Sequence, residues 1–404
     1  MDWNNIVSDI SKKYDNFYLY SEKGILSQIE NLKNSFPSVK FLYSVKCNSN
    51  EHILKSIFNS GIGADAASLG EVLLAEKHGL KKEEIFYSAP GKTTEDIENS
   101  IDNAILIADS FNEIKKIEAI AEKKDYIIKI GVRINPSFSF NGEVGSSSKF
   151  GIDEEQIYEY LQKYKTSKIS ICGIHVHLRS QELEASLLEK YYNNIMKMAK
   201  KLSTFNNVNL EYINMGSGIG IPYSKSDKSL DIKYLGERTE KAIKNFKKDY
   251  PNIKFIIETG RYLVGNNGVY VTKVLDKKIS YGKTYIIVKN TLNGFFRPSI
   301  AKLVSSYTKD EEPVAKEPLF TKIDAFEIST LKNSNLCEKV TIVGNLCTAT
   351  DVIAEDVILP QLEYDDILII SNAGAYASVL SPMQFSSQKK PLEIFWCQNG
   401  KILI

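Results

Sequence analysis

Phe41-Leu-Tyr-Ser-Val-Lys46-Cys-Asn-Ser-Asn50 joins an apolar, strand-like run to a group of small polar residues, with a single lysine at the junction. The run predicts a buried strand that holds the stem of Lys46 in the core and its amine at the carboxyl end. Such an amine suits a Schiff-base lysine. A lysine here can also mark only the point where a buried strand meets solvent. Motifs elsewhere in the chain are needed to choose between these two interpretations of Lys46.

Short β-rich runs alternate with polar, helical stretches between about residues 40 and 260. The strand candidates are 41–46, 62–66, 84–88, 103–108, 126–134, 168–177, 210–215 and 254–258. Eight such strands with helical segments between them predict an α/β fold, a (β/α)8 TIM-like barrel. The active site of such a barrel lies at the carboxyl ends of its strands. The residues at or just beyond these ends are Lys46, Asp65, Arg133, His177, Gly216 and Glu258.

Beyond about residue 265 the pattern changes to short β-rich runs, such as 268–274 and 339–343, with few helical patterns. We therefore expect a separate C-terminal all-β domain. The polar stretch 137–148 is expected to form a loop over the barrel mouth.

The composition limits the classes of function that the chain can have. The 404 residues are too many for one ordinary core, and 51 basic side chains nearly balance 50 acidic ones. This balance gives no reason to expect a nucleic-acid or membrane-surface partner, so we expect a small substrate. No signal-peptide pattern or membrane-length apolar run is present, which predicts a cytoplasmic protein.

Five cysteines are scattered without the paired spacing of metal ligands, and we expect free thiols. The alternation His175-Val-His177 places two imidazoles on one face of a strand. Two histidines could bind a metal, but no spacing supplies a third ligand, so no metal is expected.

Six further motifs follow Lys46 in a fixed order. They are Gly-Ala-Asp65-Ala-Ala-Ser-Leu-Gly-Glu71, Gly-Ile-His175-Val-His177, Asn-Met-Gly216-Ser-Gly218, Ile-Glu258-Thr-Gly-Arg261, Gly-Asn-Leu-Cys347-Thr and Asn-Ala-Gly-Ala-Tyr376. The series resembles the fold-type III pyridoxal-phosphate decarboxylases, the family of diaminopimelate and eukaryotic-type ornithine decarboxylases. The resemblance implies a homodimer with shared active sites. It also implies an N-terminal segment (1–29) that joins the β domain (266–404) and a barrel over 30–265.

The resemblance also implies a binding site for pyridoxal 5'-phosphate. Lys46 would carry the cofactor as a Schiff base, Glu258 would face the pyridine nitrogen, and His177 would stack on the ring. The phosphate would bind at the glycine-rich turn and Arg261. The full set of implied cofactor contacts is Lys46, Asp65, Arg133, His177, Ser180, Gly216, Ser217, Gly218, Glu258, Gly260, Arg261 and Tyr376.

Cys347 is implied to protonate the α-carbon in the neighbouring subunit after carbon dioxide leaves. The family's diaminopimelate decarboxylases usually carry a glutamate directly after this cysteine, but Thr348 stands here. Arg297 matches an arginine that helps to bind the distal part of the substrate. Arg179 replaces a usual glycine and either reaches an acidic group of the substrate or points to solvent. Tyr376 would contact cofactor or substrate.

The departure at Thr348 and an altered segment over 383–391 favour specialised biosynthesis, with a siderophore, antibiotic-peptide or carrier-linked substrate. Alternatives are meso-diaminopimelate decarboxylase of lysine biosynthesis, a racemase on the related barrel, and a catalytically dead member that binds a partner protein. Racemases of that kind use a tyrosine of the β domain as the opposing base, whereas this chain has Cys347 in the decarboxylase motif.

Overall fold

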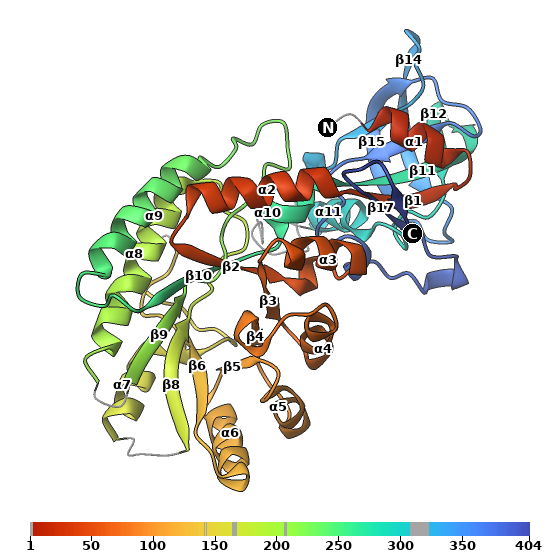
Figure 1. Cartoon of the computed structure of the whole chain (residues 1–404). Helices are drawn as coiled ribbons and strands as arrows, with labels where there is room; N and C mark the ends of the chain where they lie inside the picture. The colour runs from red at the N-terminus through yellow and green to blue at the C-terminus, as the bar shows by residue number, and fades with distance from the viewer. Residues whose placement is uncertain (1–2, 141, 143, 164–167, 206–207, 308–322) are drawn as a thin grey trace.

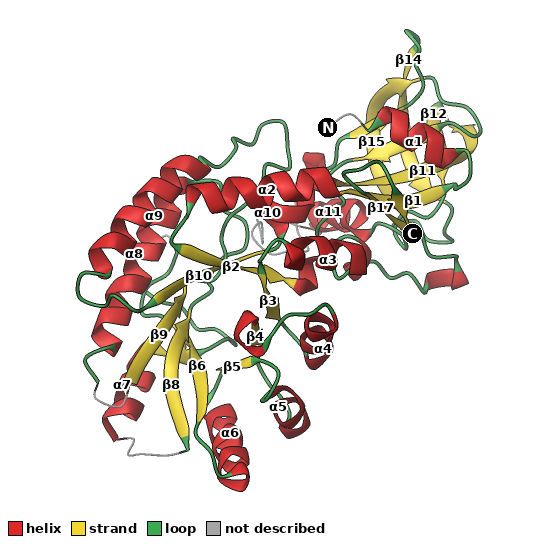
Figure 2. Ribbon diagram, in the orientation of Figure 1, coloured by secondary structure: helices red, strands yellow, loops and turns green. Residues whose placement is uncertain are grey.

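The computed structural model describes residues 3–140, 142, 144–163, 168–205, 208–307 and 323–404. A barrel of parallel strands, ringed by helices, lies beside a smaller domain built mostly of sheet (Figure 1). Figure 2 shows the helices on the outside of the barrel and the second sheet gathered beyond it. The two-part architecture expected from the sequence is therefore confirmed.

The barrel consists of eight parallel strands. They are β2 (Val39–Ser44), β3 (Gly63–Ala66), β4 (Ile85–Ser88), β5 (Ile105–Ala108), β6 (Ile128–Asn135), β8 (Ile169–His175), β9 (Val208–Asn214) and β10 (Lys254–Thr259). Pairing of β5 with β6 and of β10 with β2 closes the ring. Each expected strand run overlaps one of these strands. The short β7 (Ile152–Asp153) pairs with the end of β6.

Helices follow the strands and cover the barrel (Figure 1). They are α2 (Glu22–Ser35), α3 (Glu51–Asn59), α4 (Leu69–Lys77), α5 (Thr94–Ser100), α6 (Phe111–Lys124), α7 (Glu154–Lys163), α8 (Ala185–Leu202) and α9 (Ile232–Phe246). Side chains at the helix starts satisfy free backbone N–H groups; Ser68 caps α4 and Ser110 caps α6.

The interior of the barrel is filled by one apolar cluster that includes Leu42, Phe86, Tyr212 and Ile256. The ring of Tyr212 occupies the space beside Gly173, where an added Cβ would lie 2.0 Å from a ring carbon. A glycine is therefore required at this place for the barrel to close around the ring.

The second domain contains β1 (Asn16–Ser21), β11 (Gly268–Ser280), β12 (Lys283–Val288), β13 (Ile328–Thr330), β14 (Cys337–Gly344), β15 (Val352–Pro360), β16 (Ile367–Ile370), β17 (Leu392–Trp396) and β18 (Ile402–Leu403). Strand β1 pairs antiparallel with β11 and parallel with β17. The N-terminal α1 (Asn4–Ser11) contributes Val7 and Ile10 to the apolar cluster of this sheet.

The expectation of an all-β domain is wrong in one respect, because α11 (Phe296–Tyr307) interrupts it. Pro298 stands in its first turn, where a missing N–H costs no helical hydrogen bond. The residues after Pro298 include apolar side chains at helical spacing, Ile300, Leu303 and Val304. This helix carries Arg297 into the region between the two domains.

Candidate active site

Lys46 lies in a single 3-10 turn, Val45–Cys47, directly after β2. Its Nζ donates to Oδ2 of Asp65 at 2.8 Å, and Oδ1 of Asp65 accepts from the Ser88 hydroxyl at 2.6 Å. Burial disfavours the ammonium, but the negative charge of Asp65 outweighs burial and raises the pKa of Lys46 above its usual value. The lysine side chain remains 43% exposed and so opens to the barrel mouth, whereas Asp65 is fully enclosed.

Glu258 lies near the end of β10, and its carboxylate faces side chains of β9 and β8. Its carboxylate accepts from Nδ2 of Asn214 at 2.8 Å, and Nε2 of His175 lies 3.2 Å from Oε1. Burial opposes ionisation, but the adjacent His175, with His177 and Lys46, holds the pKa of Glu258 far below its usual range. The barrel therefore holds an ionised carboxylate in an enclosed place.

His177 is held by two neighbours. Its Nδ1 accepts from the backbone N–H of Ser217 at 3.0 Å, and Nε2 lies 3.3 Å from Oγ of Ser180. Because Nδ1 is an acceptor, the ring proton of the neutral imidazole lies on Nε2. Burial lowers the pKa of His177 to about 3, so the ring is uncharged at neutral pH.

The glycine-rich turn after β9 passes close to the segment after β8. Gly216 has φ +67°, and an added Cβ there would lie 2.2 Å from the carbonyl oxygen of Val176. The protein already uses two of the amides of this turn, because Gly216 donates to Asn214 and Ser217 donates to His177. Within the described residues, the N–H groups of Gly218 and Ile219 donate to no protein acceptor and can bind a phosphate.

Two buried arginines share one phenol. Nη1 of Arg261, in α10 (Arg261–Val264), donates to the hydroxyl of Tyr223 at 2.6 Å, and Nη1 of Arg297 donates to the same oxygen at 3.1 Å. Burial would raise the pKa of Tyr223, but the two guanidinium charges lower it. In the described part of the chain, Nε and Nη2 of both arginines have no hydrogen-bond partner. Such unsatisfied buried cations form a site for an anionic or carbonyl-bearing group.

Tyr376 connects the second domain with the Lys46 turn. Its backbone, at φ +53°, lies in the left-handed region, and its N–H donates to the carbonyl of Cys47 at 2.8 Å. The guanidinium of Arg261 lies 5.0 Å from the centre of the Tyr376 ring. Lys46, Asp65, His177, Glu258, Arg261 and Tyr376, here called the mouth cluster, thus come together in one chain.

Arg133 and Arg179 have partners of their own. Arg179 donates to Glu182 at 2.5 Å and lies 4.5 Å from the ring centre of Phe140. Arg133 lies 3.6 Å from Asp109 and 4.3 Å from the ring centre of Phe150. Gly260 packs tightly on the Lys46 turn, since a Cβ there would lie 2.8 Å from Cβ of Cys47.

Cys347 lies apart from these residues, in the loop between β14 and β15. The backbone of this loop is fixed by Asp351, which accepts from the N–H groups of Leu346 and Leu292 at 2.9 Å each. The thiol is exposed and lies 3.8 Å from Oγ of Ser386, and Thr348 contacts Thr350. No hydrogen bond or ion pair among the described residues links Cys347 with the mouth cluster.

Tyr223 is a site residue that the sequence did not reveal. The available signal was its position, because Ile221-Pro222-Tyr223 directly follows the glycine-rich turn. The described residues contain no group of three or more side chains suited to a metal ion. None of the helices in the described ranges is long and apolar enough to cross a membrane.

Comparison with known proteins places this geometry in a family. Residues 22–265 match the model of the pyridoxal-dependent decarboxylases, pyridoxal binding domain. The chain is 30% identical to an L-glutamyl-[BtrI acyl-carrier protein] decarboxylase of Niallia circulans, over 96% of this chain and 90% of that protein. It is 28% identical to a diaminopimelate decarboxylase of Aquifex aeolicus, over 95% of this chain and 87% of that protein.

Comparison with solved structures gives relatives of the same kind. The crystal structure of diaminopimelate decarboxylase from Helicobacter pylori complexed with L-lysine is 27% identical, with a TM-score of 0.82 over 98% of this chain and 95% of that one. The chain belongs to the pyridoxal-dependent decarboxylases. It is a carboxy-lyase that uses pyridoxal 5'-phosphate to decarboxylate an amino acid. The free amides of Gly218 and Ile219, the ionised Glu258 and the amine of Lys46 fit this cofactor.

Proposed function

We propose that this enzyme decarboxylates an amino acid with a modified or carrier-linked distal end in specialised biosynthesis, and not meso-diaminopimelate. The observation that carries this proposal is Thr348, which follows Cys347 where diaminopimelate decarboxylases usually place a glutamate. A hydroxyl cannot pair with a distal ammonium as a carboxylate does. The similarity to a decarboxylase of a glutamyl group on an acyl-carrier protein supports the same direction.

The mouth cluster would serve the common chemistry of the family. When bound, pyridoxal phosphate delocalises the electron pair left on the α-carbon as carbon dioxide departs. The amine of Lys46 would attach the cofactor, and Asp65 orients that amine at 2.8 Å. The ionised Glu258 would keep the ring nitrogen protonated. His177, neutral and fixed through both ring nitrogens, would pack against the ring without adding a charge.

After carbon dioxide leaves, an acid must donate a proton to the α-carbon. We assign this role to the Cys347 thiol of the other subunit in a homodimer, because the thiol is exposed and lies in the second domain. Its proton would pass to the α-carbon, and the thiolate would regain a proton from solvent.

The paired arginines would bind the distal part of the substrate. Arg297 is fully buried and is fixed by hydrogen bonds to Tyr223 and to the carbonyl of Ala375. The unsatisfied nitrogens of Arg261 and Arg297 suit a carboxylate, a carbonyl or the cofactor phosphate. Arg179 is a weaker candidate for substrate contact, since Glu182 already neutralises its charge.

Diaminopimelate decarboxylation is the second candidate, because the arginine pair could also accept the distal carboxylate of that substrate. Release of carbon dioxide should be measured for meso-diaminopimelate, free glutamate and the pantetheine thioester of glutamate. We expect the thioester to be the better substrate. A kcat/KM above about 10⁴ M⁻¹s⁻¹ for meso-diaminopimelate, an ordinary value for an evolved enzyme, would return the chain to lysine biosynthesis. A colourless protein that binds no cofactor would instead indicate a partner-binding member.

A further inference from the structure

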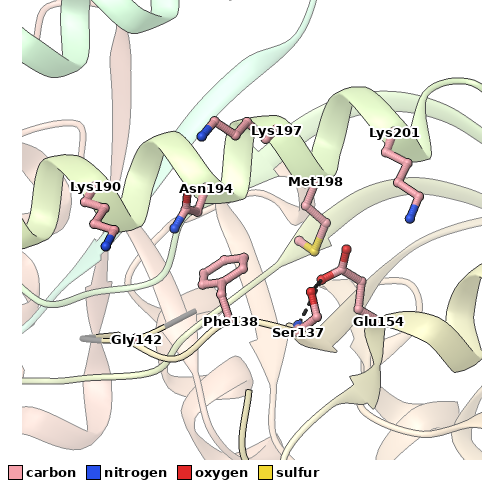
Figure 3. Close-up of a pocket in the computed structure, with 9 residues that line it drawn as sticks. All are labelled: Ser137, Phe138, Gly142, Glu154, Lys190, Asn194, Lys197, Met198 and Lys201. Atoms are coloured by element: carbon pink, nitrogen blue, oxygen red, sulfur yellow. Dashed lines mark hydrogen bonds between the residues drawn. The ribbon is translucent and has the colours of Figure 1, made fainter. Parts of the chain in front are cut away.

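A pocket of about 410 Å³ lies on the flank of the barrel, between α8 and the loop that follows β6. Figure 3 shows its lining: polar side chains along one helix, with Phe138 and Met198 beneath them. The polar side chains are Lys190, Asn194, Lys197 and Lys201. We call this pocket the α8 groove.

The charge of the α8 groove follows from the pattern of α8. Buried residues such as Leu188, Tyr191 and Ile195 hold one face of the helix against the barrel. The three lysines, at spacings of seven and four, share an exposed face. Within the described residues, Lys190 and Lys197 form no ion pair. Among the described residues that line the groove, the one carboxylate, Glu154, already accepts hydrogen bonds from Ser137 and Tyr158.

The floor of the groove is partly apolar, because Phe138 and Met198 lie there beside Ser137 and Glu154. Phe138 is only partly buried, and Met198, on α8, belongs to the buried core. A partly apolar floor with a basic rim is complementary to an amphipathic helix that has an acidic face.

The groove is connected to the mouth cluster through its loop. Phe140 packs on the Tyr191 ring, with centroids 5.0 Å apart, and on the guanidinium of Arg179 at 4.5 Å. The Tyr191 hydroxyl donates to the carbonyl of Val176 at 2.9 Å, next to His177. A partner bound in the groove would therefore contact the loop that packs, through Phe140 and Tyr191, on the segment that carries His177.

We propose that the α8 groove docks the acidic helix of a carrier protein that presents the aminoacyl substrate to the barrel mouth. The proposal rests on the proposed function, since a free amino acid needs no docking surface. The lysines would steer the carrier to the rim, and the apolar side chains of the floor, Phe138 and Met198, would fix its register. The acyl arm would then enter beside Arg179.

The test measures binding of the phosphopantetheine-loaded BtrI acyl-carrier protein, fluorescently labelled, to the enzyme containing pyridoxal phosphate. Fluorescence anisotropy gives Kd at low and at high salt. We expect the double variant Lys190→Glu, Lys197→Glu to weaken binding about tenfold. Two ion pairs between the groove and the acidic helix would be lost, and the new glutamates would repel that helix. Replacement of the same two lysines by arginine should retain affinity. The matched control is Lys55→Glu, an exposed lysine of α3 on another side of the barrel.

Decarboxylation of the glutamyl pantetheine thioester, which has no carrier domain, separates docking from chemistry. The double Lys→Glu variant should process the thioester like the wild type. The docking proposal fails if the carrier does not bind, if Lys55→Glu weakens binding as strongly, or if heparin or duplex DNA binds equally well. Lysine-dependent binding with no turnover of either substrate would support docking while refuting the proposed function.

Discussion

The mouth cluster and the Cys347 loop are built in opposite ways. In the mouth cluster, neighbours in the same chain fix each side chain, as Asp65 fixes Lys46 and Asn214 fixes Glu258. In the Cys347 loop, Asp351 holds the backbone, but the thiol itself is exposed. The difference teaches that one chain can assemble the mouth cluster while it presents outward the thiol that we propose as the acid. We therefore propose that the complete site needs two chains.

Removal of the amine tests the mouth cluster most severely. Lys46→Ala should lower kcat/KM by about 10³-fold or more, because no other residue of the cluster supplies a primary amine. Borohydride reduction followed by peptide mapping should locate the pyridoxyl group on Lys46. The matched control is Lys40→Ala, which removes a lysine near the opposite end of β2. A pyridoxyl label on any other lysine would refute the assignment.

Removal of the Cys347 thiol tests the role of the Cys347 loop. Cys347→Ala should lower activity by about 10²- to 10⁴-fold, the usual contribution of a general acid. Mixing it with Lys46→Ala should restore about a quarter of normal activity, because half of the re-paired dimers would each carry one intact site.

The control for this mixture is Lys46→Ala with Glu258→Gln. Both substitutions lie in the mouth cluster, so every site of the mixed dimer stays defective and no activity should return. If Cys347→Ala and Lys46→Ala also fail to complement after proven subunit exchange, the site lies within one chain.

A substitution at Thr348 tests whether the Cys347 loop sets the substrate preference. Thr348→Glu should raise kcat/KM for meso-diaminopimelate by about tenfold or more, because a carboxylate can pair with the distal ammonium. Thr348→Gln, which has nearly the same size but no charge, is the matched control. An equal gain in both variants would show that side-chain size and not charge sets the preference.

The smallest expected effect concerns pH and His177. Its pKa is about 3 in the folded chain and about 6.5 in an unfolded one, so the unfolded state binds the extra proton between these values. The free energy of unfolding of the apoenzyme should therefore fall as pH decreases from about 6.5 toward 3. Urea unfolding at pH 7.5 and pH 5 should show a smaller difference for His177→Gln. An unchanged difference would mean that His177 is not the group responsible.

The sequence predicted the barrel well, because every strand carries a short apolar run and ends near a polar residue. It could not show that the amides of Gly216 and Ser217 are already used by Asn214 and His177, since that depends on how two neighbouring loops meet. Tyr223 was missed for the same reason: it meets Arg261 where two segments of the barrel come together, and Arg297 only after the two domains pack. Helix α11 was missed because the surrounding β-rich runs hid its short helical pattern.

The pairing of β1 has a consequence for folding while the protein is being synthesised. Its sheet partners, β11 and β17, lie about 250 and 375 residues further along the chain. As the chain leaves the ribosome, the barrel can form while Phe17 and Leu19 still lack their neighbours from β11 and β17. These apolar residues would be exposed to chaperones and to other nascent chains until the last strands are made. Shortening the chain by its final dozen residues would leave one side of β1 without a partner, which favours aggregation.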